Sequence, residues 1–119
     1  MANCKRDLQA RNIIDTIGEI RQRVLSLDKR EFDLKKVFQK LDPKNLGEVS
    51  DTAFNYVLER ELELAEIHTY DLRSLLQTSQ EGDINYLAFI NILFNSNELF
   101  KYPLFKEMQE GKILNLNFR

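Results

Sequence analysis

Few side chains in this sequence have the types and the spacing that enzymes use for catalysis. The single cysteine, Cys4, lies near the start of the chain, and the single histidine, His68, lies between two predicted helices. Nucleophilic catalysis needs a nucleophile, a base and a group that orients the base, and the sequence shows no such set. It also has no glycine-rich phosphate loop and no pair of histidines at helical spacing. We therefore predict a protein that is not an enzyme and that has no catalytic residue and no cofactor.

The 19 Asp and Glu residues are the other candidates for chemistry, because carboxylates are preferred ligands of calcium. They stand against 17 Lys and Arg, so the net charge is only -2, and this balance argues against a nucleic-acid partner. A length of 119 residues fits one domain, and 43% hydrophobic residues are too many for a disordered chain.

The sequence favours a cytoplasmic protein. One cysteine cannot form an internal disulfide framework and suits a reducing compartment. The start of the chain has no apolar run of the kind found in signal peptides. The longest dense apolar stretch, residues 86–94, is far shorter than the roughly 20 residues of a membrane span. We expect no membrane partner.

Apolar residues at steps of three and four predict helices along most of the chain. Residues 8–27 form an amphipathic helix in this interpretation. Asp28 and Glu31 have the spacing of a capping box and predict the start of a second helix. That helix ends before Pro43, because a proline disfavours helical geometry in the residue that precedes it.

Polar residues that suit helix starts divide the rest of the chain. Ser50 or Asp51 is expected to cap a third helix, with apolar positions that continue to Ala65. Thr69 is expected to cap a short helix that ends near residue 76. Asn85 is expected to cap a helix over residues 86–94, which is apolar almost all round and is therefore predicted to be buried on more than one side.

Two segments of the chain share one plan: a helix, a loop with a glycine, a β-branched residue, and a second helix that carries an aromatic residue. Gly47 and Gly82 are the two glycines, and 35 positions separate them. Plan and period resemble a pair of EF-hands, as in half of a calmodulin-like protein, over residues 32–94. The first segment carries Phe38, Leu41, Asp42, Gly47, Val49 and Phe54, and the second carries Leu72, Leu75, Leu76, Gln77, Gly82, Ile84 and Phe89.

The resemblance implies an all-α fold with four helices and two loops joined by a short β-bridge. A glycine allows the sharp turn of each loop, and the β-branched residues pair the two loops. An N-terminal amphipathic helix (residues 1–30), the EF-hand-like pair (31–95) and a C-terminal tail with a short helix and an extended segment (96–119) then divide the chain. The residues expected to set the loop geometry are Asp42, Gly47, Val49, Gly82 and Ile84.

The calcium ligands of the family are missing from both loops. Lys44 and Leu46 stand at ligand positions of the first loop. Ala53 and Ala88 stand where the family has its bidentate glutamate. Each loop keeps one carboxylate among these positions, Asp42 or Glu81. We predict that neither loop binds calcium at cellular concentrations and that the chain has no metal site.

The resemblance also implies a groove between the four helices that can hold an amphipathic helix. The occupant is either a helix of a partner or a part of this chain, and capping by the chain's own residues 8–27 is the simpler explanation. The turn around Leu104, Phe105 and Met108 is the other internal candidate. The residues predicted to line the groove are Phe38, Leu41, Phe54, Val57, Leu58, Leu72, Leu75, Leu76, Phe89, Ile92 and Leu93.

The last residues of the chain alternate between apolar side chains and asparagine, which is typical of an extended segment. A segment of this kind is hard to bury in so small a domain, so we predict that it docks on a partner protein as an added strand or an extended anchor. The residues predicted for this docking are Leu104, Phe105, Ile113, Leu114, Leu116 and Phe118.

Degenerate EF-hand pairs that keep their shape without calcium resemble myosin light chains and the EF-hand modules of ciliary and axonemal microtubule proteins. Residues 40–50 are more similar to the ciliary kind. We expect a non-catalytic, calcium-independent structural or adaptor protein that docks on a partner protein in a cytoskeletal assembly, with axonemal microtubules as one setting. The alternative is a myosin-light-chain-like or calmodulin-like binder of an amphipathic partner helix, with weak or no calcium regulation.

Overall fold

The computed structural model describes residues 4–65 and 67–105, and within these residues the chain is all-α apart from one short pair of strands. None of the helices in the described ranges is long and apolar enough to cross a membrane. In chain order the elements are α1 (Cys4–Ser26), α2 (Glu31–Lys40), β1 (Glu48–Val49), α3 (Asp51–Arg60), α4 (Tyr70–Leu76), β2 (Ile84–Asn85), α5 (Tyr86–Phe94) and the 3-10 helix η1 (Ser96–Lys101).

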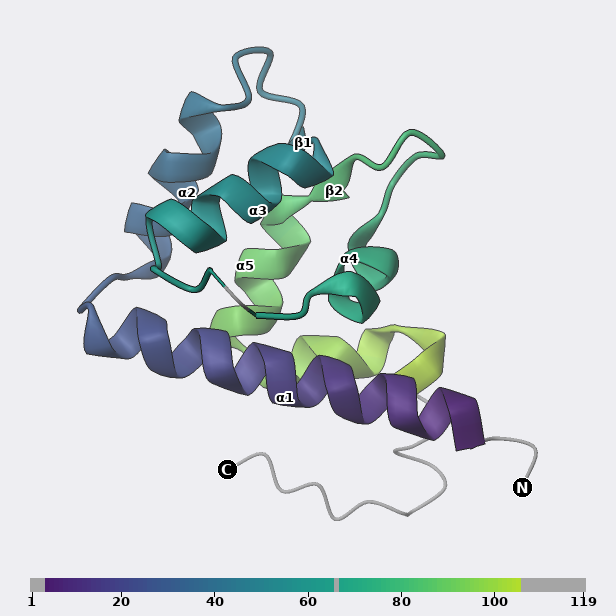
Figure 1. Ribbon diagram of the computed structural model, residues 1–119. Coiled ribbons are helices and arrows are strands. Elements are labelled where there is room, and N and C mark those ends of the chain that lie inside the picture. Colours follow the sequence, from purple (N-terminus) through teal and green to yellow (C-terminus); the bar gives the residue numbers. More distant parts are fainter. Residues whose placement is uncertain (1–3, 66, 106–119) are drawn as a thin grey trace.

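The long helix α1 runs across one side of the molecule, and the loops before β1 and β2 project on the opposite side (Figure 1). The two strands are antiparallel neighbours, with Glu48 opposite Asn85 and Val49 opposite Ile84. Val49 and Ile84 therefore make the contact between loops that the repeat predicts. The strand pair joins the helix pair α2 and α3 to the helix pair α4 and α5.

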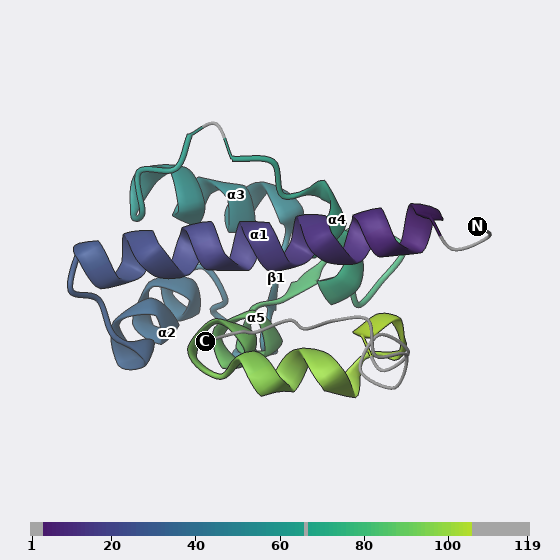
Figure 2. The same ribbon diagram turned by 90° about the horizontal axis from the view of Figure 1, so that it is seen from below.

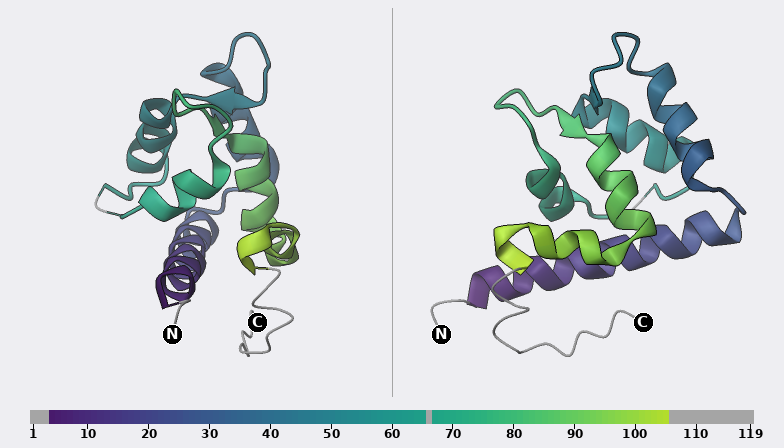
Figure 3. Two further views of the ribbon diagram at one scale, coloured as in Figure 1. Left: turned by 90° about the vertical axis from the view of Figure 1, so that its right-hand side faces the viewer. Right: turned by 180° about the vertical axis from the view of Figure 1, so that it is seen from behind.

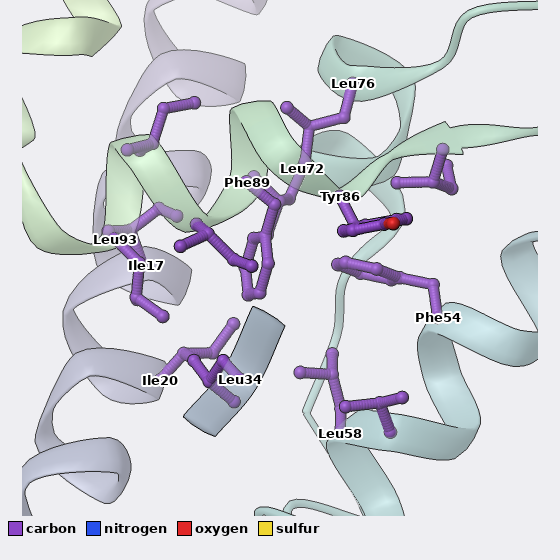
Figure 4. Close-up of a cluster of buried hydrophobic side chains, with 14 of the residues drawn as sticks. Ile17, Ile20, Leu34, Phe54, Leu58, Leu72, Leu76, Tyr86, Phe89 and Leu93 are labelled. Atoms are coloured by element: carbon purple, nitrogen blue, oxygen red, sulfur yellow. The ribbon is translucent and has the colours of Figure 1, made fainter. Parts of the chain in front are cut away.

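The core lies where side chains from all five α-helices meet (Figure 4). Its centre is aromatic. The ring of Phe38 on α2 stacks on the ring of Tyr86 on α5, with centroids 5.1 Å apart. The ring of Phe54 on α3 meets the edge of Phe89 on α5 at 4.9 Å. Because α5 supplies both partner rings, it is the central helix of the core.

Helix α5 is buried on more than one side, as its apolar sequence predicts. It contacts α1, α2, α4, β1 and η1. Its last residue is Phe94, and η1 then turns away from α5 and follows α1 (Figure 2). The buried side chains of α5 are Tyr86, Phe89, Ile90, Ile92 and Leu93.

Helix α1 folds back on the rest of the chain, which answers the question that the sequence left open. Its contacts are chiefly with α4 and α5, and the views of Figure 3 show it passing along the ends of the other helices. Ala10 and four larger aliphatic side chains at helical spacing belong to the common core, the larger ones being Ile13, Ile17, Ile20 and Val24.

Two of the four predicted caps are present and the cap at Asp28 is wrong, while Thr69 stands at the N-cap position of α4 but its side chain makes no capping hydrogen bond. The side chains of Ser50 and Asn85 accept hydrogen bonds from backbone amides in the first turns of α3 and α5. The capping box at Asp28 does not form, because Asp28 has a left-handed φ of 57° in the tight turn after α1. Helix α2 begins after Arg30 instead, whose amide donates to the Asp33 carboxylate at 2.8 Å.

Helix α3 is also shorter than predicted. It ends at Arg60, and Glu63 follows with a left-handed φ of 56°. Leu62 is nevertheless fully buried. The apolar pattern therefore indicated burial correctly beyond the point where the helix stops.

Candidate functional site

The loop after α2 is organised around one buried carboxylate. Asp42 is only 6% exposed. Its Oδ1 accepts a hydrogen bond from the Leu46 amide at 2.9 Å, and its Oδ2 accepts one from the Gly47 amide at 2.8 Å. Gly47 has a φ of +82°, which L side chains rarely adopt. The carboxylate thus holds the backbone of its own loop in a sharp turn.

The same carboxylate also binds the second half of the repeat. The Tyr86 hydroxyl donates a hydrogen bond of 2.7 Å to Asp42 Oδ2. Tyr86 is the first residue of α5, follows directly on β2 and is fully buried. A charge-assisted bond in a buried setting is stronger than a neutral one. Asp42 and Tyr86 therefore fasten the first loop to the start of the last α-helix.

The charges at this pair follow from these contacts. Burial raises the pKa of Asp42, but the hydrogen bonds from Tyr86 and from the Leu46 and Gly47 amides outweigh burial, so the pKa of Asp42 lies below its usual value. Burial and the Asp42 carboxylate together raise the pKa of Tyr86 to about 12. At neutral pH the pair is a carboxylate that accepts from a neutral phenol.

The loop before β2 is held by a hydroxyl in place of a carboxylate. Ser79 Oγ accepts from the amides of Glu81 and Asp83 at 3.2 and 3.3 Å. It also donates to Asp83 Oδ2 at 3.2 Å. Gly82, with a φ of +94°, is the glycine equivalent to Gly47. Both loops are therefore closed by side chains of the protein itself.

The described residues contain no cluster of three or more His, Cys, Asp or Glu side chains arranged to hold a metal ion. Two carboxylates stand at positions where the resemblance predicts calcium ligands, and Asp42 is the one that accepts from three donors. Glu81 is exposed on the other loop. The two carboxylates belong to different loops and do not form a common site.

The residues predicted to line a groove are mostly core residues. Leu75 is partly buried and Leu41 is 39% exposed. The aliphatic face of α1 belongs to the same cluster, so an outside helix that uses this surface must displace α1. Binding of a partner in this groove stays a prediction. The buried members of the set are Phe38, Phe54, Val57, Leu58, Leu72, Leu76, Phe89, Ile92 and Leu93.

The tail prediction needs one correction. Phe105 is fully buried in the protein's own core, so it is not available to a partner. The reason is that η1 turns the chain back along α1, and Leu99 and Phe105 then reach the core. Leu104 is partly buried against the same cluster. The four other predicted residues lie outside the described ranges: Ile113, Leu114, Leu116 and Phe118.

A cleft of about 380 Å³ lies between α1 and the segment that leads into α4. Two hydrogen bonds cross it: Asn12 Nδ2 donates to Asp71 Oδ2 at 3.0 Å, and Thr16 Oγ1 donates to the His68 carbonyl at 3.3 Å. The first bond ties α1 to α4, and the second ties α1 to the segment that precedes α4. The lining residues are Asn12, Asp15, Thr16, Glu19, Ile67, His68, Tyr70 and Asp71.

The contact between Asp42 and Tyr86 is the part of the site that the sequence did not reveal. The two residues are 44 positions apart. From the sequence, a tyrosine at the start of an apolar helix is simply predicted to be one more core residue. No local signal marks its hydroxyl as a hydrogen-bond donor to the distant loop.

Comparison with known proteins found no relative of this chain. No family model matches the chain, and no curated protein or solved structure matches it.

Proposed function

We propose that this chain is a degenerate EF-hand pair that acts, without catalysis and without calcium, as a structural or adaptor module on a partner protein in a cytoskeletal assembly. The observation that carries the proposal is the Asp42 carboxylate. It stands at the first ligand position that the resemblance implies, and it accepts from two loop amides and from the Tyr86 hydroxyl.

These hydrogen bonds support calcium independence on energetic grounds. A calcium ion needs six to eight oxygen ligands, several of them anionic, to offset its dehydration. Binding at Asp42 would have to compete with three donors for one carboxylate, and Lys44 adds a positive charge nearby in the loop. The Asp42 carboxylate closes the turn of the loop by accepting from the Leu46 and Gly47 amides. The contact to Tyr86 holds the two halves of the repeat together, which is the state that a constitutive module requires.

The position of α1 supports an adaptor over a binder of partner helices. The α1 face carries four large buried aliphatic side chains, and burial of each side chain of this size contributes roughly 1.5–3 kcal/mol. A partner helix would have to replace this contact before it gained any affinity. Docking through surfaces that α1 leaves free needs no such exchange.

The test of calcium independence is a calorimetric titration with calcium, paired with thermal unfolding in calcium and in chelator. We expect no micromolar binding and the same midpoint in both conditions. Asp42→Asn and Glu81→Gln serve as a matched pair, because each removes one loop carboxylate. Only the first should lower the midpoint. Micromolar calcium binding by the unaltered protein would refute the proposal.

The test of the adaptor role is affinity capture with the full chain, followed by identification of partners, with and without chelator. Recovery of the same cytoskeletal partners in both conditions supports a constitutive structural role. Loss of the partners on chelation contradicts it.

A further inference from the structure

The outward face of α2 carries a row of lysines. Leu34 and Phe38 on the inward side of this helix are fully buried, while the side chains at steps of three and four on the other side are exposed. Lys44 continues the row in the loop after α2 and is exposed as well. We call this surface the α2 basic face and define it by Phe32, Lys35, Lys36, Lys40, Lys44 and Leu46.

The lysines of the α2 basic face are not neutralised by carboxylates of the described chain. The ion pairs of the described residues lie on other elements, such as Arg73 of α4 with Asp51 of α3 at 3.5 Å, and Lys101 with Glu98 within η1 at 3.0 Å. Within residues 4–65 and 67–105, none of the four lysines has a carboxylate oxygen within 4.0 Å. An exposed row of unpaired lysines attracts an anionic partner.

The charges of the chain are also segregated. Residues 29–44 contain six of the 17 Lys and Arg, although the whole chain carries a net charge of -2. Of the three acidic residues in that segment, Asp42 is buried and bonded, Asp33 accepts from the Arg30 amide at the start of α2, and Glu31 is exposed. Acidic side chains line the cleft beside α1 instead. The positive surface is therefore local and is not a property of the whole molecule.

Large apolar side chains stand at both ends of the lysine row. Phe32 is 66% exposed and Leu46 is 65% exposed. Lys36 Nζ lies 5.3 Å above the centre of the Phe32 ring, so the first of these side chains is held beside the positive charge. A ligand for this surface combines negative charge with apolar groups that reach Phe32 or Leu46.

We propose that the α2 basic face binds an acidic peptide segment of the partner protein, one in which carboxylates alternate with apolar side chains. This rests on the proposed function, since it states the chemistry of the partner of that same module. A nucleic acid fits less well, because stacking surfaces for bases use several aromatic rings and this face offers one. A membrane fits less well, because interfacial helices carry a continuous apolar face, whereas here the apolar side chains lie at the two ends.

The test is fluorescence anisotropy of the full chain with a labelled peptide of glutamates that carries leucine at its centre. The double variant Lys36→Glu/Lys40→Glu should weaken binding about tenfold or more, and higher salt should weaken binding by the unaltered protein. Phe32→Ser should weaken binding about threefold, without loss of stability because Phe32 is exposed.

The matched control is Arg11→Glu/Arg60→Glu, which changes the net charge equally at exposed positions on α1 and α3. It should leave the affinity within about twofold. Circular dichroism checks that each variant is folded, and Lys36→Gln/Lys40→Gln replaces the glutamate pair if that pair unfolds, with a smaller expected loss. Equal weakening by the α2 variant and the control, or no saturable binding, overturns the inference.

Two competitors separate the other anionic ligands. One competitor is phosphatidylserine vesicles and the other is single-stranded oligothymidylate. If either binds more tightly than the peptide and loses binding in the same α2 variant, the α2 basic face is assigned to a membrane or a nucleic acid, and the proposal of a peptide ligand is overturned. If peptide binding requires calcium, the proposed calcium-independent function is refuted, but the assignment of the peptide to the α2 basic face is not. If the α2 variant still captures the cytoskeletal partners in full and without calcium, the peptide-binding role of the α2 basic face is refuted and the proposed function is not.

Discussion

Arg21 on α1 donates a hydrogen bond of 2.8 Å from its Nε to the backbone carbonyl of Leu93 on α5. Its Nη2 reaches the Ile92 carbonyl at 3.4 Å. The last carbonyls of a helix have no partner within the helix and carry partial negative charge. A guanidinium group therefore stabilises them by donating hydrogen bonds and by its positive charge. α1 is therefore joined to the central helix by polar as well as apolar contacts.

Arg21→Met should lower the free energy of unfolding by about 1–3 kcal/mol, because it leaves carbonyls at the end of α5 without their donor. Arg23→Met is the control on the same helix, since Arg23 reaches Glu63 only at 4.0 Å between exposed side chains. Its cost should stay below about 1 kcal/mol. Urea unfolding measures both values. Equal costs would show that the contact with α5 contributes nothing of its own.

Tyr86→Phe should cost about 1–2 kcal/mol of stability, because it removes the hydrogen bond to Asp42 and keeps the ring that stacks on Phe38. Tyr56→Phe is the control, since Tyr56 is half exposed on α3, and its effect should be near zero. Urea unfolding near neutral pH is the measurement. A neutral result for Tyr86→Phe would mean that the fold does not depend on the bond between loop and helix.

The protein should lose stability at alkaline pH through Tyr86. Its folded pKa is raised to about 12, while an unfolded tyrosine has a pKa of about 10. The stabilisation of the neutral phenol is therefore fully present below pH about 10 and is lost as pH rises toward about 12. The loss approaches roughly 2–3 kcal/mol.

The measurement for this pH effect is the difference in unfolding free energy between the unaltered protein and Tyr86→Phe. Subtraction removes the titration of lysines and of the other tyrosines. The difference should shrink between pH about 10 and pH about 12. A constant difference would contradict the raised pKa of Tyr86.

Two glycine substitutions should have opposite signs. Gly47→Ala should destabilise by about 1–2 kcal/mol, because Gly47 has a φ of +82° and an added Cβ would lie 3.0 Å from Leu87 Cδ1. Gly18→Ala should stabilise by up to about 1 kcal/mol, because Gly18 lies inside α1 and its added Cβ would meet nothing within 4 Å. Thermal unfolding reports both, and the same sign for both would contradict the assigned backbone geometry.

Phe89→Ala should cost about 3–5 kcal/mol, because Phe89 is fully buried and its ring meets the rings of Phe38 and Phe54. Phe32→Ala removes the same atoms from an exposed position and should change the unfolding free energy by less than about 0.5 kcal/mol. The comparison is made by urea unfolding with both variants. A small effect of Phe89→Ala would place the centre of the core elsewhere.

Features that depend on neighbouring residues could be predicted from the sequence. Helical periodicity located α1 to α5, and the short polar side chains of Ser50 and Asn85 located two helix starts. Asp28 was misread because a tight turn and a helix cap use the same residue types. Its left-handed φ follows from the turn that reverses the chain between α1 and α2.

Features that depend on distant residues could not be predicted. The apolar face of α1 indicated that this face is buried, but helical periodicity alone does not predict which part of the protein packs against it. Tyr86 and Arg21 look like an ordinary core aromatic and an ordinary surface cation in the sequence. Each acquires its role only when α5 is placed against the first loop and against α1.

The central position of α5 has a consequence for the order in which the protein is made. Phe38 and Phe54 leave the ribosome long before Tyr86 and Phe89, the rings that they contact in the finished core. Helix α1 emerges earlier still, and its aliphatic face shares one core with Phe105. Until residue 105 has left the ribosome, the nascent protein exposes apolar surface without its partner, and exposed apolar surface of this kind makes an incompletely folded chain prone to aggregation.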